Sequence, residues 1–299
     1  MKRLLPLLLL IGTVLLSGCI GQPTTPPLGT NGIIISSFSP DITPITAGDV
    51  IELILEVENV GGATAEKVKT NLSGVTFGEG DLDWSCEEDT SDVSFGDLMP
   101  PENGIPGEEH TEAWTCTSPS GIKSDTVYTF DVRVNYDYST DVTGTLTFVT
   151  GDYWRSLTQD EKEKLSEKGG ISQLSQTAGP LSIKLYAGRR TRPFIIYDPE
   201  DKTYTLRVVI NNVGSGKPTD NKVKIIQQKS STGLKINCFE AGEEEREITL
   251  SRGKTASISC DLTLEGNVIN RQDFTVALGF EYNWNVDSST DVTVEKPLT

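Results

Sequence analysis

The chain has 299 residues, enough for two domains of ordinary size. About 36% of the residues are hydrophobic and 23% are charged, which is typical of a folded protein rather than a disordered or wholly membrane-embedded one. Acidic side chains number 43 against 26 basic ones, and a chain with a net charge of −17 repels nucleic-acid phosphates. A single histidine, His110, excludes metal centres and catalytic sites that need several histidines.

The first 18 residues have the pattern of a secretory signal. Lys2 and Arg3 precede an apolar run from Leu4 to Leu16, which is shorter than the ~20 residues of a membrane-spanning helix. The run ends in Leu-Ser-Gly-Cys, which resembles the lipobox of exported lipoproteins, where cleavage before the cysteine leaves its thiol to carry the lipid. The resemblance implies a mature chain that begins at lipid-modified Cys19 on the outer face of the cytoplasmic membrane. An ordinary signal peptide with an incidental cysteine is the alternative.

The residues after the signal contain a tether and an even number of cysteines. Residues 19–32 are rich in Pro, Thr and Gly, which predicts an extended tether between the lipid and the first domain. Beyond Cys19, four cysteines remain in what we expect to be an exported chain, so two disulfides are predicted, with free buried thiols as the alternative. The four are Cys86, Cys116, Cys238 and Cys260.

An internal repeat organises the rest of the chain. The sequence Asn-Val-Gly at residues 59–61 recurs at residues 212–214, each time after an alternating strand and before Lys-Val-Lys. Further landmarks follow in the same order, with Cys86 matching Cys238, Cys116 matching Cys260 and Phe130 matching Phe274. Because each copy owns one cysteine pair, we expect the disulfides to be Cys86–Cys116 and Cys238–Cys260.

Strand patterns dominate both copies. The alternating runs at residues 130–138 and 274–284 place aromatic and aliphatic side chains on one face, as a buried core or, alternatively, as a carbohydrate platform. Short strands separated by Gly, Pro, Asp and Ser predict an all-β fold of two tandem antiparallel immunoglobulin-like β-sandwiches. A short helix at residues 156–170, capped by Ser156 or Thr158, is expected to join the sandwiches as a spacer.

These boundaries give the predicted domain organisation. A lipoprotein signal peptide covers residues 1–18 and the tether covers residues 19–32. The first, acidic sandwich covers residues 33–150, a helical linker covers residues 151–180, and the second sandwich covers residues 181–299.

The turn of the first copy carries a family resemblance. Asn-Val-Gly-Gly-Ala-Thr-Ala at residues 59–65 resembles the cell-adhesion-related (CARDB) domain and kindred immunoglobulin-like modules of archaeal and bacterial surface proteins. The resemblance implies an immunoglobulin-like fold in an archaeal surface lipoprotein, and it transfers no active site. The second copy departs from the pattern, because Gly-Ser-Gly-Lys-Pro-Thr follows Asn-Val with no matching alanine. We expect Asn and Gly to supply the positive φ of a tight strand reversal.

Charge is distributed unevenly between the copies. Residues 20–150 hold 22 acidic and four basic side chains, whereas residues 181–299 hold 16 of each. Clustered carboxylates can supply the six to eight oxygens of a Ca²⁺ site, the one cofactor considered, although no EF-hand spacing is present and a solvated acidic face is the alternative. The candidate ligands are Asp81, Asp83, Glu87, Glu88 and Asp89.

Two further motifs are candidate sites. Arg189, Arg190 and Arg192 could bind phosphate, sulfate or an acidic partner, could dock on the acidic first copy of this chain or of a neighbour, or could form an exposed basic turn. Asn71-Leu72-Ser73 fits the N-glycosylation sequon.

The sequence contains no recognisable catalytic constellation. His110 lies in an acidic loop without triad partners, and no Gly-rich phosphate loop follows a strand. We therefore predict a lipid-anchored cell-surface structural or adhesive protein without catalytic activity. It would contact the membrane through the lipid at Cys19 and bind an unknown surface protein or glycan, but no nucleic acid. An extracytoplasmic accessory subunit that docks to a membrane transporter or secretion complex is the alternative.

Overall fold

The structure is a computed structural model, which describes residues 29–166, 170–188, 192–198, 200 and 202–297. These residues form strands in three sheets, two short helices and one 3₁₀ turn, so the predicted all-β class is confirmed. No described helix is long and apolar enough to cross a membrane. The predicted signal peptide, most of the predicted tether and Cys19 lie outside the described residues.

Two small sheets of four strands repeat one strand order. The first sheet, in spatial order, comprises β1 (Ile33–Pro40), β3 (Val50–Asn59), β7 (Glu109–Thr117) and β5 (Ser85–Cys86). The second comprises β10 (Leu181–Ala187), β12 (Thr203–Asn212), β17 (Thr255–Leu264) and β15 (Leu234–Asn237). The shared order reflects the internal repeat of the sequence, with β3 corresponding to β12 and β7 to β17.

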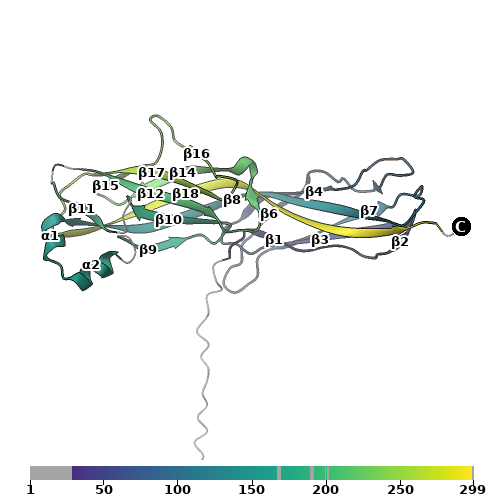
Figure 1. Cartoon of the computed structure of the whole chain (residues 1–299), viewed down its shortest axis with the longest axis horizontal. Helices are drawn as coiled ribbons and strands as arrows, with labels where there is room; N and C mark the ends of the chain where they lie inside the picture. Colours follow the sequence, from purple (N-terminus) through teal and green to yellow (C-terminus); the bar gives the residue numbers. More distant parts are fainter. Residues whose placement is uncertain (1–28, 167–169, 189–191, 199, 201, 298–299) are drawn as a thin grey trace, which may run out of the picture.

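The third sheet has ten strands and runs the length of the molecule (Figure 1). Two strands of 25 residues form its centre, β8 (Thr126–Thr150) and β18 (Arg271–Glu295). They pair antiparallel from Arg271 opposite Val149 to Val294 opposite Thr126. At ~3.3 Å per residue, this two-stranded ribbon is about 80 Å long. The other strands are β2 (Ile45–Thr46), β4 (Ala65–Ser73), β6 (Val93–Leu98), β9 (Ile171–Gln176), β11 (Phe194–Ile196), β13 (Lys217–Pro218), β14 (Lys222–Ser230) and β16 (Arg246–Thr249).

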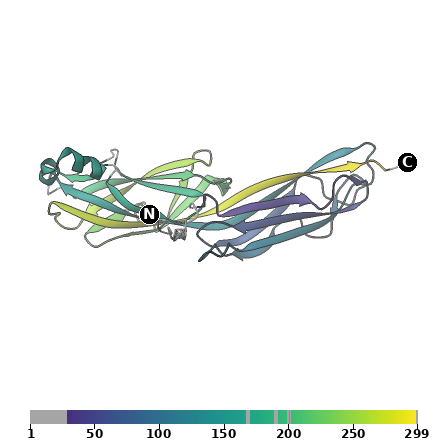
Figure 2. The same cartoon turned by 90° about the horizontal axis from the view of Figure 1, so that it is seen from below.

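The ribbon belongs to two lobes that lie end to end (Figure 2). We define the first lobe as residues 33–137 with 283–295, and the second lobe as residues 139–281. In the first lobe β4 pairs with the early half of β8, and in the second lobe β14 pairs with the early half of β18. The late half of each long strand enters the other lobe, where β8 pairs with β9 and β18 pairs with β2. Each copy of the repeat therefore completes the sandwich of the other.

A pseudo-twofold axis relates the two copies. Tyr138 and Tyr282 are separated by the same 144 residues as the matched pair Phe130 and Phe274, and they stand directly opposite each other in the ribbon. Their ring centroids are 6.1 Å apart. We call this point, where the axis passes between the lobes, the waist.

The predicted domain boundary and linker differ from the structure. β8 crosses from the first lobe into the second without a break, because its alternation of buried and less buried residues continues past Tyr138 to Leu146. The helices α1 (Gly151–Ser156) and α2 (Gln159–Ser166) follow β8 at the end of the second lobe farthest from the first (Figure 1). They cover part of the predicted helix, but they are not a spacer between the sandwiches.

Thr158 is the predicted cap that the structure confirms. Its hydroxyl accepts a hydrogen bond from the backbone N–H of Glu161 at 3.4 Å, and the Glu161 carboxylate accepts one from the backbone N–H of Thr158 at 2.8 Å. This reciprocal pair is a capping box. The shorter helix α1 uses Thr150 in the same way, since its hydroxyl accepts from the N–H of Tyr153.

The alternating runs of the sequence pack inward as predicted for a core. Phe130, Val132 and Val134 are buried in the first lobe, and Val276, Leu278 and Phe280 are buried in the second. Late residues of the long strands enter the core of the opposite lobe. Phe148 of β8 stacks on Phe194 at 4.5 Å and meets Phe274 edge to face at 5.4 Å, while Val292 and Val294 of β18 are fully buried in the first lobe.

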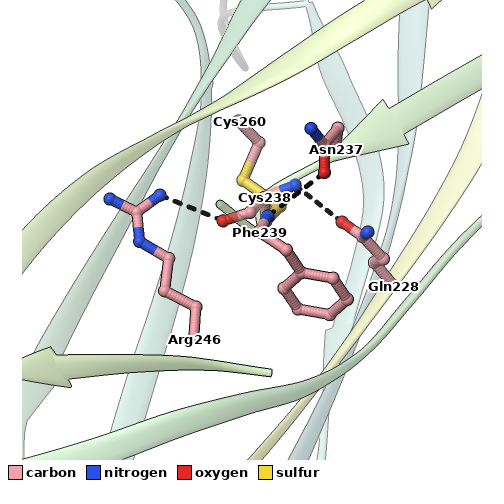
Figure 3. Close-up of a disulfide and its surroundings, with 6 residues drawn as sticks. All are labelled: Gln228, Asn237, Cys238, Phe239, Arg246 and Cys260. Carbon is pink, nitrogen blue, oxygen red and sulfur yellow. Dashed lines mark hydrogen bonds between the residues drawn. A yellow bond between two sulfur atoms is a disulfide. The ribbon is translucent and has the colours of Figure 1, made fainter. Parts of the chain in front are cut away.

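Both predicted disulfides are confirmed. Cys86–Cys116 joins β5 to β7, and Cys238–Cys260 joins the end of β15 to β17 at the equivalent edge of the other small sheet. Figure 3 shows the second disulfide braced from the large sheet. The Gln228 side-chain oxygen accepts from the backbone N–H of Cys238 at 2.6 Å, and the Arg246 guanidinium donates to its carbonyl at 3.0 Å.

The Asn-Val-Gly turns hold buried amide networks. Asn59 is fully buried; its side-chain N–H groups donate to the carbonyls of Ala63 and Leu98, and its side-chain oxygen accepts from Gly61. Asn212 repeats the arrangement with the carbonyls of Gly216 and Gly253 and the N–H of Gly214.

The expected reason for this turn sequence is wrong. None of the Asn and Gly residues of the two turns has a positive φ. Asn is required for its three hydrogen bonds, and glycine is required for close approach. A Cβ at Gly61 would lie 1.9 Å from the hydroxyl of Tyr138, and a Cβ at Gly214 would lie 2.7 Å from the ring of Pro180.

In what we call strand exchange, the late half of each long strand completes the sandwich of the other copy. Substitutions in β18 distinguish strand exchange from two copies that fold as independent tandem domains. Val292→Ala should lower stability by about 1.5–3 kcal/mol because a buried side chain is lost. Hydrogen exchange should accelerate in β1, β3 and β7 of the first lobe. Val276→Ala, the matched control, should accelerate exchange in β10, β12 and β17 instead. If Val292→Ala instead accelerates hydrogen exchange in the second lobe, the late half of β18 does not belong to the core of the first lobe.

The amide networks should be among the most sensitive positions of the fold. Asn59→Ala leaves two buried carbonyls and one N–H without partners, and should cost about 3–5 kcal/mol in chemical denaturation. Asn59→Asp should be comparably destabilising, because a carboxylate cannot donate to those carbonyls. Asn211→Ala, at the neighbouring half-buried position in the second copy, should cost less than 1.5 kcal/mol, roughly one hydrogen bond. Equal losses at Asn59 and Asn211 would argue against the network.

Candidate functional site

Tyrosines of the long strands stabilise the waist through hydrogen bonds. The hydroxyl of Tyr138 accepts from the N–H of Ala63 at 3.0 Å and donates to the carbonyl of Ala178 at 3.2 Å, so it joins segments of both lobes. Tyr136 accepts from the N–H of Ile33 at 3.0 Å, where the chain enters β1. Burial raises the pKa of Tyr136 and Tyr138 above the ordinary phenol value. The two phenol groups therefore stay protonated and hold neighbouring segments of the chain together.

A cleft of about 450 Å³ crosses the outer surface of the waist. Two ion pairs join neighbouring strands in it, at 2.9 Å for Lys67–Asp137 and 3.0 Å for Lys222–Glu247, and the cleft is also lined by Glu66, Asp220 and Glu281. Partial burial raises the pKa of Asp137, but hydrogen bonds from Asn283 and Lys67 outweigh it, and the pKa lies below its usual value. The cleft therefore offers a polar contact surface that carries charges of both signs.

A larger groove of about 740 Å³ lies on the outer face of the first lobe. We call it the first-lobe groove. At its centre Arg133 of β8 forms two hydrogen bonds to Asp287 of β18, at 2.6 and 3.1 Å. This exposed pair spans the seam where the late half of β18 enters the first lobe. Its other lining residues are Asn71, Ser73, Asp131, Val132, Asn135, Ser288 and Ser289.

The sequence identified Asn71 through its sequon but did not reveal either hollow. Each hollow combines residues far apart in the chain, such as Arg133 with Asp287 or Lys67 with Lys222. Outward polar positions of β8 and β18 are visible in the alternating pattern. The pairing of β8 with β18 is not visible there, because a two-residue period shows which face of the sheet a side chain occupies but not which strand lies beside it.

The acidic residues proposed as calcium ligands do not converge. Among the described residues, no group of three or more His, Cys, Asp or Glu side chains is arranged to hold a metal ion. Asp83 and Glu88 instead accept hydrogen bonds from the backbone N–H groups of Gly80 and Thr115. Asp81, Glu87 and Asp89 are exposed on the same stretch. The structure thus gives Asp83 and Glu88 backbone contacts and places the others on an exposed acidic face.

The arginine cluster lies only partly within the described residues, because Arg189 and Arg190 fall outside them. Arg192 is exposed beside β11, which pairs with the last residues of β8. That position is ten residues beyond Tyr138, roughly 33 Å along the strand from the waist. Arg192 therefore does not contact the acidic first lobe of its own chain, and the other roles considered for the cluster stay predictions.

His110 occupies a packed position on β7. Its ring stacks on Phe95 with centroids 4.1 Å apart, and its Nε2 lies 3.4 Å from a carboxylate oxygen of Glu112. Phe95 belongs to the large sheet and His110 to the first small sheet, and neither side chain lines either hollow. The geometry is that of side-chain packing between the two sheets of the lobe.

Comparison with solved structures finds distant likenesses. Red sea bream transglutaminase aligns with 90% of this chain at 11% identity and a TM-score of 0.20, and the chain spans 32% of its length. The CupB6 tip adhesin from Pseudomonas aeruginosa aligns over 90% of this chain and 99% of its own at 7% identity and a TM-score of 0.18. The collagen adhesin from S. aureus aligns over 90% and 94% at 10% identity and a TM-score of 0.10.

Likenesses at these scores carry no argument about function. No protein-family match and no match among curated proteins is found. The resemblance to the cell-adhesion-related domain stays a prediction. What is established is an all-β body with two disulfides.

The waist tyrosines predict a limit at alkaline pH. Burial raises the pKa of Tyr136, Tyr138 and Tyr282, so the unfolded chain releases these phenol protons first. Their contribution to stability is complete below the unfolded pKa of ~10 and is lost as pH rises above it. Phenolate absorbance of the three should appear together with loss of β-sheet circular dichroism. Tyr282→Phe should reduce this dependence, whereas Tyr197→Phe, at an exposed position, should not. Ionisation of all three in a native spectrum would refute the assignment.

Proposed function

We propose that the protein is an exported, lipid-anchored surface protein that binds partners through its two ends and has no catalytic role. Two structural disulfides support an oxidising, extracytoplasmic location, because such bonds persist there and are rare in reducing compartments. The leader and lipobox sequence supports anchoring at Cys19. The packed position of His110 supports a binding role over a catalytic one.

The proposal rests mainly on where the N-terminal residues of the described chain contact the folded lobes. Asn31 accepts hydrogen bonds from the backbone and side chain of Ser215 at 2.8 and 3.1 Å, and the carbonyl of Gly32 accepts from Val60. These contacts lie at the waist, between the two repeat turns. With ten residue steps from Cys19 to Gly29, a tether would hold the middle of the rod within about 35 Å of the lipid surface. The rod would then lie crosswise, with both ends free.

Both ends present exposed apolar side chains in hollows. At the second-lobe end, Tyr197 and Ile269 are 70% and 81% exposed and line a hollow of about 480 Å³ beside α1. At the first-lobe end, Ile42 and Val50 are 55% and 56% exposed in a hollow of about 310 Å³. Exposed apolar clusters rimmed by polar residues are typical of protein contact sites. We therefore assign the partner contacts to the ends of the rod.

Anchoring is tested by fractionation of cells that make the full chain. Cys19→Ser should move the protein from the membrane to the soluble fraction, because the lipid has no other attachment point. Thr24→Ser in the tether, the matched control, should leave it in the membrane. Protease added to intact cells should degrade the wild-type protein. Membrane retention of Cys19→Ser would overturn the anchor.

The role of the ends is tested by pull-down from the protein's own membranes. Tyr197→Ser with Ile269→Ser should abolish a contact made at the second-lobe end, and Ile42→Ser with Val50→Ser should do so at the other. Partners retained by all four substitutions together would show that the contacts lie elsewhere.

A further inference from the structure

The first-lobe groove contains polar side chains that have no protein partner. Within the described part of the chain, the side chains of Asn71, Asn135 and Ser289 form no hydrogen bond, although each lines this groove. Arg133 and Asp287 pair with each other at its centre and retain exposed edges. The groove therefore offers donors and acceptors in alternation, which suits a ligand with many hydroxyl groups.

The sequence supplies a means of placing such a ligand there. Asn71-Leu72-Ser73 is the single Asn-X-Ser/Thr sequence in the 299 residues. Because side chains alternate along β4, Asn71 and Ser73 face the groove while Leu72 is buried in the core. The one possible acceptor asparagine thus lines a groove of about 740 Å³.

We propose that Asn71 carries an N-linked glycan whose first sugars lie along the first-lobe groove, against Asn135, Ser289 and the Arg133–Asp287 pair. This rests on the extracytoplasmic location proposed above. The donor is a glycan linked through its anomeric carbon to a lipid phosphate. The Asn71 amide nitrogen forms a bond to that carbon, the carbon–oxygen bond to phosphate breaks, the lipid phosphate leaves as an anion, and one amide proton passes to a base of the transferase.

Strand exchange keeps the acceptor accessible during export. In the folded sheet β4 lies between β8 and β6, where an enzyme cannot draw the strand out. The first lobe cannot close, however, until residues 283–295 have arrived, because they pair with the early half of β8. Asn71 therefore stays in an open chain until almost the whole protein has crossed the membrane. After closure the glycan would cover the seam between β8 and β18.

The modification is tested on the protein isolated from its own cells. Mass spectrometry of the peptide containing Asn71 should show a glycan, and both Asn71→Gln and Ser73→Ala should remove it. Lys229→Asn in the Asn71→Gln background is the matched control, since it creates Asn-Ser-Ser at residues 229–231 on β14, the strand equivalent to β4. That site, too, should be modified.

Hydrogen exchange tests the placement of the glycan. Amides of β18 between Asn285 and Asp291 should exchange on the order of tenfold more slowly in the glycosylated protein than in Asn71→Gln, because the glycan covers the seam. A glycan carried by the Lys229→Asn control should not restore this protection.

Three results count against these assignments, and they are distinguishable. An unmodified Asn71 in protein that protease reaches on intact cells would overturn the modification and leave the surface location standing. A modified Asn71 with unchanged exchange in β18 would overturn the groove as the glycan's position. Protein that protease on intact cells cannot reach would overturn the proposed surface function itself.

Discussion

The antiparallel pairing of β8 with β18 is the constraint on which the rest of the structure depends. Neither copy of the repeat completes its own sandwich, since the late half of each long strand fills the lobe of the other copy. The two lobes are consequently joined by two continuous strands and not by a linker. Contacts of such long sequence separation form late in folding, so the first lobe waits for the end of the chain.

Disulfides and side-chain hydrogen bonds stabilise the parts of the body that the ribbon does not hold together. The small sheets share no strands between lobes, and each is closed at its outer edge by a disulfide from a short strand to its neighbour. At the waist, Tyr138 binds segments of both lobes, and the Asn59 and Asn212 networks hold the turns that pack there. The entry of the chain at this same point gives the body two ends that face away from any tether.

Much of this could be predicted from local sequence patterns. Period two correctly identified the buried faces of β8 and β18, and the repeated position of Cys86 and Cys238 correctly fixed the disulfides, because equivalent copies place equivalent side chains together. The exchange could not be predicted in this way. The alternation in β8 runs on through Tyr138, but it does not reveal which lobe the later residues enter. The helix that follows Thr158 was recognised by its cap, but its predicted place between the sandwiches was wrong for the same reason.

The candidate sites show the same division. Asn71 was found from its sequon, whereas the groove around it depends on Asp287 and Ser289, which reach the first lobe only through the exchange. The acidic residues around Cys86 suggested a metal site from composition alone, yet the backbone directs Asp83 and Glu88 to separate N–H groups. A cluster of charged residues in the sequence shows that the charges lie close together along the chain, but it does not show that their side chains meet in space.

Small-angle X-ray scattering of the body without residues 1–28 tests the central claim most directly. Two continuous strands predict one elongated particle whose profile is identical at about 0.1 M and 1 M salt, where the Debye length falls from ~10 Å to ~3 Å. The calculated profile of the interlocked rod should fit both data sets without a mixture of shapes. A profile that changes with salt, or that requires several angles between the lobes, would contradict the continuous ribbon.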